Sequence, residues 1–194
     1  MNKQTRLITQ EEYELILKTL RNGYEHNGVV RKQNEKLCMI LICEANLGCR
    51  ISDVLSLKLN SFQMLDNRCV INITEKKTGK ERKFSCNIQF YNFLLEYCIR
   101  KGITNKNRKI FDIHERAVQK SLKQVCEYLH LEEIGSHSFR KFFATSVYTK
   151  SNFNIAYTQR VLMHSSPATT LRYIGMEEKE LERILQETVN IPQL

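Results

Sequence analysis

The sequence lacks the features that mark membrane-spanning, secreted and zinc-binding proteins. Its longest apolar run, Leu37 to Cys43, is far too short to cross a bilayer, and the opening MNKQTRLITQ holds no apolar signal core. The seven cysteines are odd in number and include no C-x-x-C pair, which is typical of reduced, buried thiols. Histidine and cysteine do not cluster at the spacing of a zinc site. We therefore expect a soluble, cytoplasmic protein with no metal and no disulfide framework.

Repeats, low-complexity tracts and internal linkers are also missing, so the 194 residues are expected to form one globular unit. Lysine and arginine number 30 against 21 for aspartate and glutamate, and the resulting charge of +9 favours a polyanionic partner. Many basic proteins bind nothing acidic, however. Charge alone therefore leaves it open whether nucleic acid is the partner.

Hydrophobic periodicity predicts a mainly helical α+β protein with one small sheet. Thr9 and Glu12 have the Ser/Thr-x-x-Glu form of a capping box ahead of the first helix. A loop is expected from 23 to 28, and Pro167 is expected to interrupt the chain before a short helical turn. The predicted helices cover about residues 10–21, 31–46, 51–57, 90–97, 118–129, 139–147, 154–163, 169–174 and 177–189.

A basic hairpin is predicted from strands at 69–74 and 80–86. Lys77 directly precedes the turn at Thr78 and Gly79, which would put its ammonium at a loop tip able to fold over DNA. A lysine positioned there could protonate a leaving alkoxide. The alternative is that the whole run EKKTGKERK is a solvated face, as charge runs usually are.

Two residues three positions apart, His137 and Arg140, would share one face near the start of a helix capped by Ser136 or Ser138. Free backbone N–H groups add partial positive charge there, and the planar fork of arginine donates paired hydrogen bonds to phosphate oxygens. Such a face can hold a phosphate. By itself, however, H-x-x-R more often marks a surface pair on an amphipathic helix.

An isolated arginine, Arg50, follows the apolar second helix. It must reach an anion or solvent, because an unpaired buried charge is very costly. Its position between Cys49 and Ile51 suits a pocket. The alternative is a helix-terminal arginine in water that pairs with Asp53 at i+3.

Near the C-terminus, Tyr173 stands nine residues after His164. Leu171 and Ile174 could anchor a short helix that leaves the phenol exposed, and a phenolate is a fair nucleophile for phosphorus. The alternative is a packed core tyrosine. His164 could donate to a phosphoryl oxygen or cap the end of its own helix.

In order and spacing, these residues resemble the tyrosine recombinase (phage integrase) family, over nearly the whole chain. The matching segments are RLITQEEYELIL, LGCRISDVLSLK, EKKTGKERK, GSHSFRKFFAT and VLMHSSPATTLRYIG, of which the last is the most specific. The resemblance implies the fold of the family's catalytic domain with a small antiparallel sheet. It also implies an enzyme that cuts and rejoins DNA through a 3′-phosphotyrosine, with no metal, cofactor or external energy source.

The resemblance implies a role for each matching residue. Tyr173 would be the nucleophile and Lys77 the general acid. Arg50 and Arg140 would hold the scissile phosphate, and His164 would help to stabilise the pentacoordinate state. This agrees with phosphoryl transfer chemistry, in which fixed cations around the equatorial oxygens contribute most.

Other residues would surround this set. By the same resemblance, His137 would assist proton removal or hold the phosphate, and Asp53 would orient the pocket from behind. On the basic hairpin, Lys76, Lys80 and Arg82 are expected to contact DNA.

Two departures from the family pattern concern packing. Met163 stands where Gly usually precedes the histidine, and Cys49 where Leu is common. Neither removes a reacting group. The N-terminal core-binding domain of most members is absent, so 1–194 is expected to be a single catalytic domain, either a fragment or a natural single-domain protein. It would have a lead-in at 1–8 and a tail helix over about 177–194.

The expected partner is double-stranded DNA in a bacterial nucleoid, on which members of the family work as homotetramers. Without DNA a monomer is expected. Neither a membrane nor a small-molecule substrate is expected as a partner. Two alternatives stay open. One is a non-cleaving, sequence-specific DNA-binding module of the same fold, and the other is a type IB topoisomerase-like enzyme, which relaxes supercoils without pairing sites.

Overall fold

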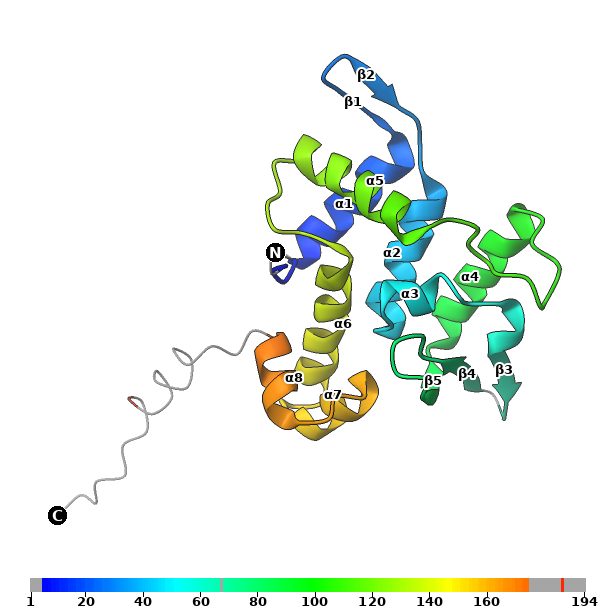
Figure 1. Cartoon of the computed structure of the whole chain (residues 1–194), viewed down its shortest axis with the longest axis vertical. Helices are drawn as coiled ribbons and strands as arrows, with labels where there is room; N and C mark the ends of the chain where they lie inside the picture. The colour runs from blue at the N-terminus through cyan, green and yellow to red at the C-terminus, as the bar shows by residue number, and fades with distance from the viewer. Residues whose placement is uncertain (1–4, 67, 175–185, 187–194) are drawn as a thin grey trace. The chain divides into compact units, whose positions relative to one another are not determined.

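A computed structural model describes residues 5–66, 68–174 and 186 of the chain (Figure 1). The chain divides into two compact units, Met1–Phe143 and Ala144–Leu194. The predicted tail helix lies outside the described residues, apart from position 186. In the described part of the chain, no helix combines the length and apolarity that a membrane crossing requires.

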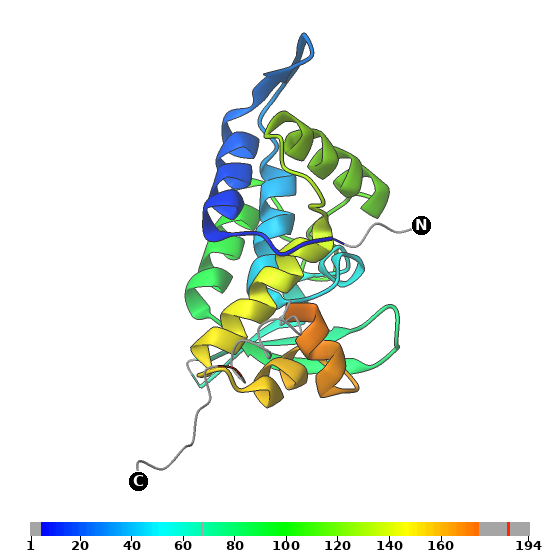
Figure 2. The same cartoon turned by 90° about the vertical axis from the view of Figure 1, so that its left-hand side faces the viewer.

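Three helices build the core of the first unit: α1 (Gln10–Asn22), α2 (Glu35–Leu47) and α5 (Glu115–Tyr128). All three contact one another, and Figure 2 shows α1 and α2 side by side. Every residue from Leu37 to Cys43 is buried. This is expected of a helix that is apolar around its whole circumference, because such a helix is stable only when other elements cover it on all sides.

The first helices begin where side chains cap them. The predicted capping box is confirmed: Thr9 Oγ1 accepts from the Glu12 backbone N–H at 3.2 Å, and the Glu12 carboxylate accepts from the Thr9 backbone N–H at 2.9 Å. α2 begins later than predicted, because Asn34 Oδ1 accepts from the backbone N–H of Leu37 at 3.0 Å and so caps the helix there.

The other helices of this unit add buried side chains to the same core. Tyr13 on α1 stacks on Phe142 with ring centroids 5.1 Å apart and meets Phe139 edge-on at 6.1 Å. These contacts fix the first part of α6 (Ser136–Lys150) against α1. The remaining helical elements are α3 (Ile51–Val54), the 3-10 turn η1 (Leu59–Ser61), α4 (Ile88–Arg100) and α6 (Ser136–Lys150), whose last residues belong to the second unit.

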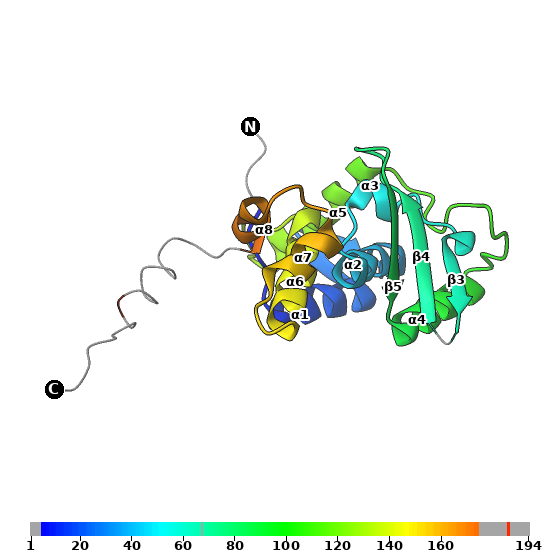
Figure 3. The same cartoon turned by 90° about the horizontal axis from the view of Figure 1, so that it is seen from below.

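A three-stranded antiparallel sheet, in the order β3-β4-β5, forms the other part of the unit. The predicted strands are confirmed as β4 (Arg68–Thr74) and β5 (Glu81–Cys86), and the edge strand β3 (Phe62–Leu65) was not predicted. Figure 3 shows the three strands side by side, and α4 contacts the central strand. Ile71 and Ile73 on β4 are buried, as the alternation of that segment requires.

The expectation of one sheet was wrong, because a second antiparallel ribbon stands where a loop was predicted. β1 (Tyr24–His26) pairs with β2 (Val29–Arg31), and the ribbon projects beyond the helices in Figure 1. Asn27 and Gly28 between the strands both have positive φ, 53° and 71°. An Asn-Gly pair with two positive φ values forms the tight turn whose twist matches antiparallel strands.

The second unit contains the end of α6, then α7 (Ile155–Leu162) and α8 (Pro167–Ile174), which pack on each other. Pro167 was expected to interrupt the chain, but it is the first residue of α8. Proline is well suited to this position, because its missing N–H would have no helical partner there. Ser166 supports the start of the helix, since its Oγ accepts from the Thr169 backbone N–H at 3.2 Å.

Candidate active site

Arg50 lies at a sharp turn between α2 and α3. Gly48 ends α2 in the left-handed conformation, with φ 57° and ψ 27°, and Arg50 then precedes α3 in an extended conformation. Arg50 Nη1 forms an ion pair with Glu75 Oε2 at 2.8 Å. The partner is therefore Glu75 on the hairpin and not Asp53, which was the alternative considered from the sequence. The Arg50 side chain keeps 22% of its surface exposed, so an incoming anion could reach it.

Glu75 was missed by the sequence reasoning. It is only 2% exposed, and its Oε2 also accepts a hydrogen bond from Thr78 Oγ1 at 2.9 Å. Burial acts to raise the pKa of this carboxyl, but the hydrogen bonds from Arg50 and Thr78 outweigh it and the pKa is lowered. A signal was present in the sequence: Glu75 continues the alternation of Ile71 and Ile73, the inward-facing residues of β4.

The loop between β4 and β5 carries Lys77 at its exposed turn, as predicted. Lys76 and Lys80 beside it are exposed as well. The backbone N–H of Lys76 donates to Asp53 Oδ1 at 3.0 Å. Asp53 is fully buried on α3, so its carboxylate connects the helix behind Arg50 to the loop that bears Lys77.

Arg140 is buried, with 2% of its surface exposed, and its Nη1 donates to the carbonyl oxygen of Gly48 at 2.8 Å. This bond attaches α6 to the turn that carries Arg50. A guanidinium so constrained is pre-organised, because its planar fork has lost much of its freedom before any ligand arrives.

Arg82 requires a correction. It was expected to contact DNA, but it is only 3% exposed, and its guanidinium donates to the carbonyl oxygens of Gly48 at 3.3 Å and Leu47 at 3.1 Å. It also lies 4.3 Å from the ring centroid of Phe84, in cation–π geometry. The charge run therefore divides: its lysines face outward, and Arg82 holds the end of α2.

His137 lies in the first turn of α6, close to two arginines. The side chain of His137 is solvent-accessible. Nearby protein atoms nevertheless desolvate the ring in part, and this lowers the pKa of His137 from 6.5. The charges of Arg140 and then Arg50 lower it further. The three predicted residues thus share one electrostatic environment, in which a neutral imidazole is favoured at pH 7.

A buried acid, Glu44, completes this environment. It is fully buried on α2, and neither carboxyl oxygen has a hydrogen-bond partner among the residues that the structure describes. Burial raises the pKa of Glu44 well above 4.5, and the nearby charge of Arg140 opposes this shift without cancelling it. A neutral carboxyl is what such a site favours, because an isolated buried carboxylate would be far more costly.

The second unit brings His164 and Tyr173 together. Their rings meet edge-on, with centroids 5.1 Å apart and an angle of 80° between the planes. Nδ1 of His164 lies 3.1 Å from Oγ1 of Thr170, which is fully buried. Tyr173 itself is half-buried on α8, but its phenolic oxygen is buried, so the expectation of an exposed phenol was wrong. Thr170 was not singled out in the sequence, although its spacing of one helical turn from Ser166 is visible there.

Met163, the departure from the family pattern beside His164, ends α7 in a left-handed conformation with φ 55° and ψ 38°. Glycine adopts this conformation without strain, and a methionine there costs about 1–2 kcal/mol. The backbone at this point is therefore the one that a glycine would favour. The substitution changes the side chain before His164, not the path of the chain.

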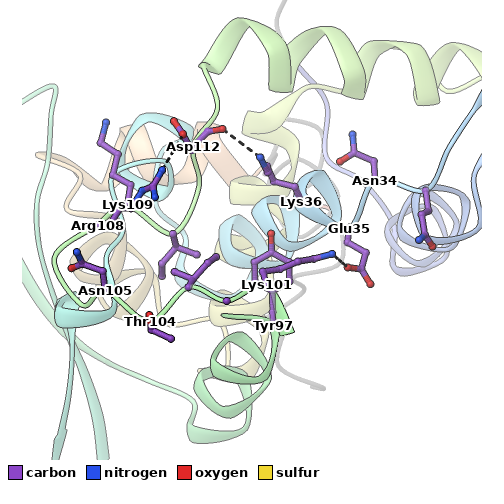
Figure 4. A pocket seen from close by; sticks show the side chains of 14 residues that line it. Asn34, Glu35, Lys36, Tyr97, Lys101, Thr104, Asn105, Arg108, Lys109 and Asp112 are labelled. Carbon is purple, nitrogen blue, oxygen red and sulfur yellow. Dashed lines mark hydrogen bonds and ion pairs between the residues drawn. The ribbon is translucent and has the colours of Figure 1, made fainter. Parts of the chain in front are cut away.

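A separate hollow of about 670 Å³ lies between the start of α2 and the segment 101–112 (Figure 4). None of the predicted catalytic residues lines it. Its charged side chains largely pair with one another: Lys101 contacts Glu35 at 2.5 Å, and Arg108 contacts Asp112 at 3.6 Å. The hollow is thus distinct from the cluster around Arg50.

Comparison with known proteins identifies the class. A model described as the phage integrase family matches residues 6–185. The chain is 30% identical over 166 residues to "Probable integrase/recombinase YoeC" of Bacillus subtilis (strain 168), covering 84% of this chain and 90% of that protein. It is 28% identical over 186 residues to "Probable integrase/recombinase" of Acholeplasma phage L2. The chain belongs to the phage integrase family.

Solved structures agree on the fold. The XerH site-specific recombinase, in a post-cleavage complex with its palindromic difH substrate, superposes with a TM-score of 0.68 and 22% identity over 96% of this chain. The catalytic domain of bacteriophage HP1 integrase gives 0.64 and 18% over 95% of this chain. The predicted fold class is therefore confirmed as that of tyrosine recombinase catalytic domains.

The fraction of each relative's length that this chain covers differs. The chain covers 96% of the HP1 catalytic domain, but only 54% of the XerH chain and 59% of the phage L2 protein. For these longer relatives, the chain thus spans little more than half of their length.

Proposed function

We propose that this chain carries the catalytic domain of a site-specific DNA recombinase. Family membership supports a role in DNA recombination, and the observation that carries the enzymatic proposal is the cluster around Gly48. There Arg50, Arg140 and the Lys77 loop are held within one unit by hydrogen bonds, each of which involves a buried side chain. Fixed cations of this kind stabilise the negative charge that develops on a phosphoryl group in the transition state.

In the proposed reaction, Tyr173 attacks the scissile phosphorus. A bond forms between the phenolic oxygen and phosphorus while the bond from phosphorus to the 5′-oxygen breaks. Lys77 donates a proton to that 5′-oxygen, and His137 accepts the phenolic proton. The lowered pKa of His137 supports the latter role, because a neutral imidazole is able to take up a proton.

The remaining groups would stabilise the transition state. Arg50 and Arg140 would bind the non-bridging oxygens, and His164 would donate to one of them. Asp53 would keep the Lys77 loop in place through its bond to the backbone of Lys76. The covalent 3′-phosphotyrosine conserves the energy of the broken phosphodiester, so a partner strand's 5′-hydroxyl can reverse the step.

The proposed partner is double-stranded DNA, contacted in part by the exposed ammonium groups of Lys76 and Lys80. Recombination would use a homotetramer on two DNA sites, whereas the DNA-free chain would be a monomer. Binding should weaken with salt, with a log-log slope of about −0.9 for each phosphate neutralised.

Covalent capture tests the proposal. The protein is incubated with a pool of nicked duplexes that have a randomised centre, and covalent adducts are isolated under denaturing conditions and sequenced. An adduct that disappears in Tyr173→Phe is the expected result. Binding of a defined sequence without any adduct would identify the non-cleaving module instead. Relaxation of a random plasmid, with no requirement for a site, would identify a topoisomerase.

A further inference from the structure

The buried side chain of Glu75 contacts two parts of the proposed catalytic apparatus at once. Its Oε2 accepts from Arg50 Nη1 at 2.8 Å and from Thr78 Oγ1 at 2.9 Å. Thr78 directly follows Lys77 in the turn. One carboxylate oxygen therefore links Arg50, which is proposed to bind the phosphate, to Thr78, which is next to the proposed general acid Lys77.

The backbone of Glu75 closes the same loop. Its N–H donates to the carbonyl oxygen of Lys80 at 2.9 Å, and its carbonyl oxygen accepts from the Gly79 N–H at 2.8 Å. Glu75 thus stands where β4 ends and the Lys77 loop begins. Because these bonds and the side-chain bonds come from one buried residue, moving Arg50 and moving the loop are mechanically connected.

The pair with Glu75 leaves Arg50 able to bind phosphate. Arginine has five N–H donors, and Glu75 takes a bond from Nη1. The 2% exposure of Glu75 against 22% for the Arg50 side chain indicates that the carboxylate lies on the protein side of the guanidinium. An anion arriving from solvent would therefore meet a guanidinium whose plane is already held from behind.

We propose that Glu75 is a positioning residue that sets the orientation of Arg50 and the conformation of the Lys77 loop together. The proposal rests on the function proposed above and adds a residue to it. The Arg50 ion pair and the Thr78 hydrogen bond support different contributions to the same cleavage step. The former acts on the binding of the phosphoryl oxygens and the latter on protonation of the leaving 5′-oxygen.

The experiment compares two versions of the duplex obtained by covalent capture, one with the natural 5′-oxygen leaving group and one with sulfur at that bridging position. A thiolate leaves readily without a proton, so loss of a general acid matters only for the oxygen substrate. Single-turnover cleavage rates are measured on both. Lys77→Ala should lose roughly a hundredfold on oxygen and be near wild type on sulfur, whereas Arg50→Ala should lose rate on both.

Two further variants test the proposal, and their rate losses on the two substrates are compared with those of Lys77→Ala and Arg50→Ala. Thr78→Val removes the link to the loop, and we expect a loss of about tenfold on oxygen that the sulfur substrate restores. Glu75→Gln keeps the size of the side chain but removes the ion pair. We expect it to lose rate on both substrates, by about tenfold more on oxygen than on sulfur. Glu81→Gln, at an exposed carboxyl of the same hairpin, is the matched control and should cleave both at the wild-type rate.

A purely structural Glu75 would lower both rates by one common factor, so an unchanged oxygen-to-sulfur ratio in Glu75→Gln would overturn the proposal. Wild-type rates on both substrates would overturn it equally. Thermal melting of each variant establishes that the measured protein is folded, and Thr78→Val supplies the second reading if Glu75→Gln does not fold. If the wild-type chain itself forms no adduct, the proposed function fails; if it cleaves and only the ratios disagree, the inference about Glu75 fails alone.

Discussion

Arg140 and Arg82 donate to the same oxygen, the carbonyl of Gly48, at 2.8 and 3.3 Å. A carbonyl oxygen has two lone pairs and can accept both bonds. The two guanidinium groups come from α6 and β5, and both are buried. The turn before Arg50 is therefore fixed by two cations from elements far apart in the sequence, although only one of them is a proposed phosphate ligand.

Arg82→Met should destabilise the protein rather than weaken its contact with DNA. The change removes the bonds to the Leu47 and Gly48 carbonyls from a buried site, and we expect a loss of about 2–4 kcal/mol in the free energy of unfolding. Relief of repulsion with Arg140 offsets part of the loss. Urea denaturation measures it.

Lys80→Met provides the comparison, because Lys80 is exposed on the same hairpin. It should leave stability within about 0.5 kcal/mol of wild type and reduce DNA affinity at low salt. Equal stability of the two variants would show that Arg82 does not hold the turn.

Gly48→Ala should be much more disruptive than an ordinary glycine substitution. A Cβ at this position would lie 2.2 Å from a ring carbon of Phe143, and φ is +57°. We expect about 1–2 kcal/mol from the backbone conformation and a further loss of about 1–3 kcal/mol from the clash.

Gly28→Ala separates these two contributions. Its φ is +71°, but apart from the two neighbouring residues in the chain no described residue has an atom within 4 Å of the added Cβ. It should therefore lose only the backbone part, and the difference between the two unfolding free energies measures the contact with Phe143. Similar losses in both variants would contradict this account.

Much of the fold was predictable because local rules determined it. The Thr9 capping box and the alternation of β4 each specify their element by neighbouring residues alone. The ribbon at Asn27 and Gly28 was missed because its strands are too short to show a pattern, although the Asn-Gly turn itself was readable.

The site was predictable in its residue types but not in its contacts. Lys80 and Arg82 are both positively charged residues of the same charge run, yet Lys80 is exposed and Arg82 is buried. The partner of Arg50 likewise depends on which strand residue faces inward, and Asp53 was nearer in sequence than Glu75. Tertiary packing decides such pairings, and a single sequence does not record it.

Glu44→Gln should change the pH dependence of stability. Burial raises the pKa of Glu44 well above 4.5, so above pH 4.5 the unfolded chain releases a proton that the folded chain keeps. Folding stability from this group is therefore present at low pH and is lost as the pH rises. The amide that replaces the carboxyl in the variant does not titrate. We expect the stability of the variant relative to wild type to increase as the pH is raised from about 4 to about 7.

Urea titrations at several pH values measure this relative stability, and the slope matters rather than the absolute value, because a buried amide has its own desolvation cost. Glu96→Gln, which removes an exposed carboxyl from α4, is the control. A relative stability that falls toward neutral pH would mean that Glu44 is ionised in the folded protein, as a partner of Arg140.

Thr170→Val should slow DNA cleavage while leaving the shape of α8 intact. Valine keeps the volume of threonine but lacks the hydroxyl that lies 3.1 Å from Nδ1 of His164. The ring of His164, which meets Tyr173 edge-on, would then lose a bond that orients it. Displacement of a catalytic group by about 1 Å can cost as much as a hundredfold in rate, and for this partial loss of orientation we expect about tenfold.

Single-turnover adduct formation measures this loss in rate. Thr169→Val, at an exposed position one residue earlier, is the control. If Thr169→Val slows cleavage as much as Thr170→Val does, the effect comes from the start of α8 and not from the orientation of His164.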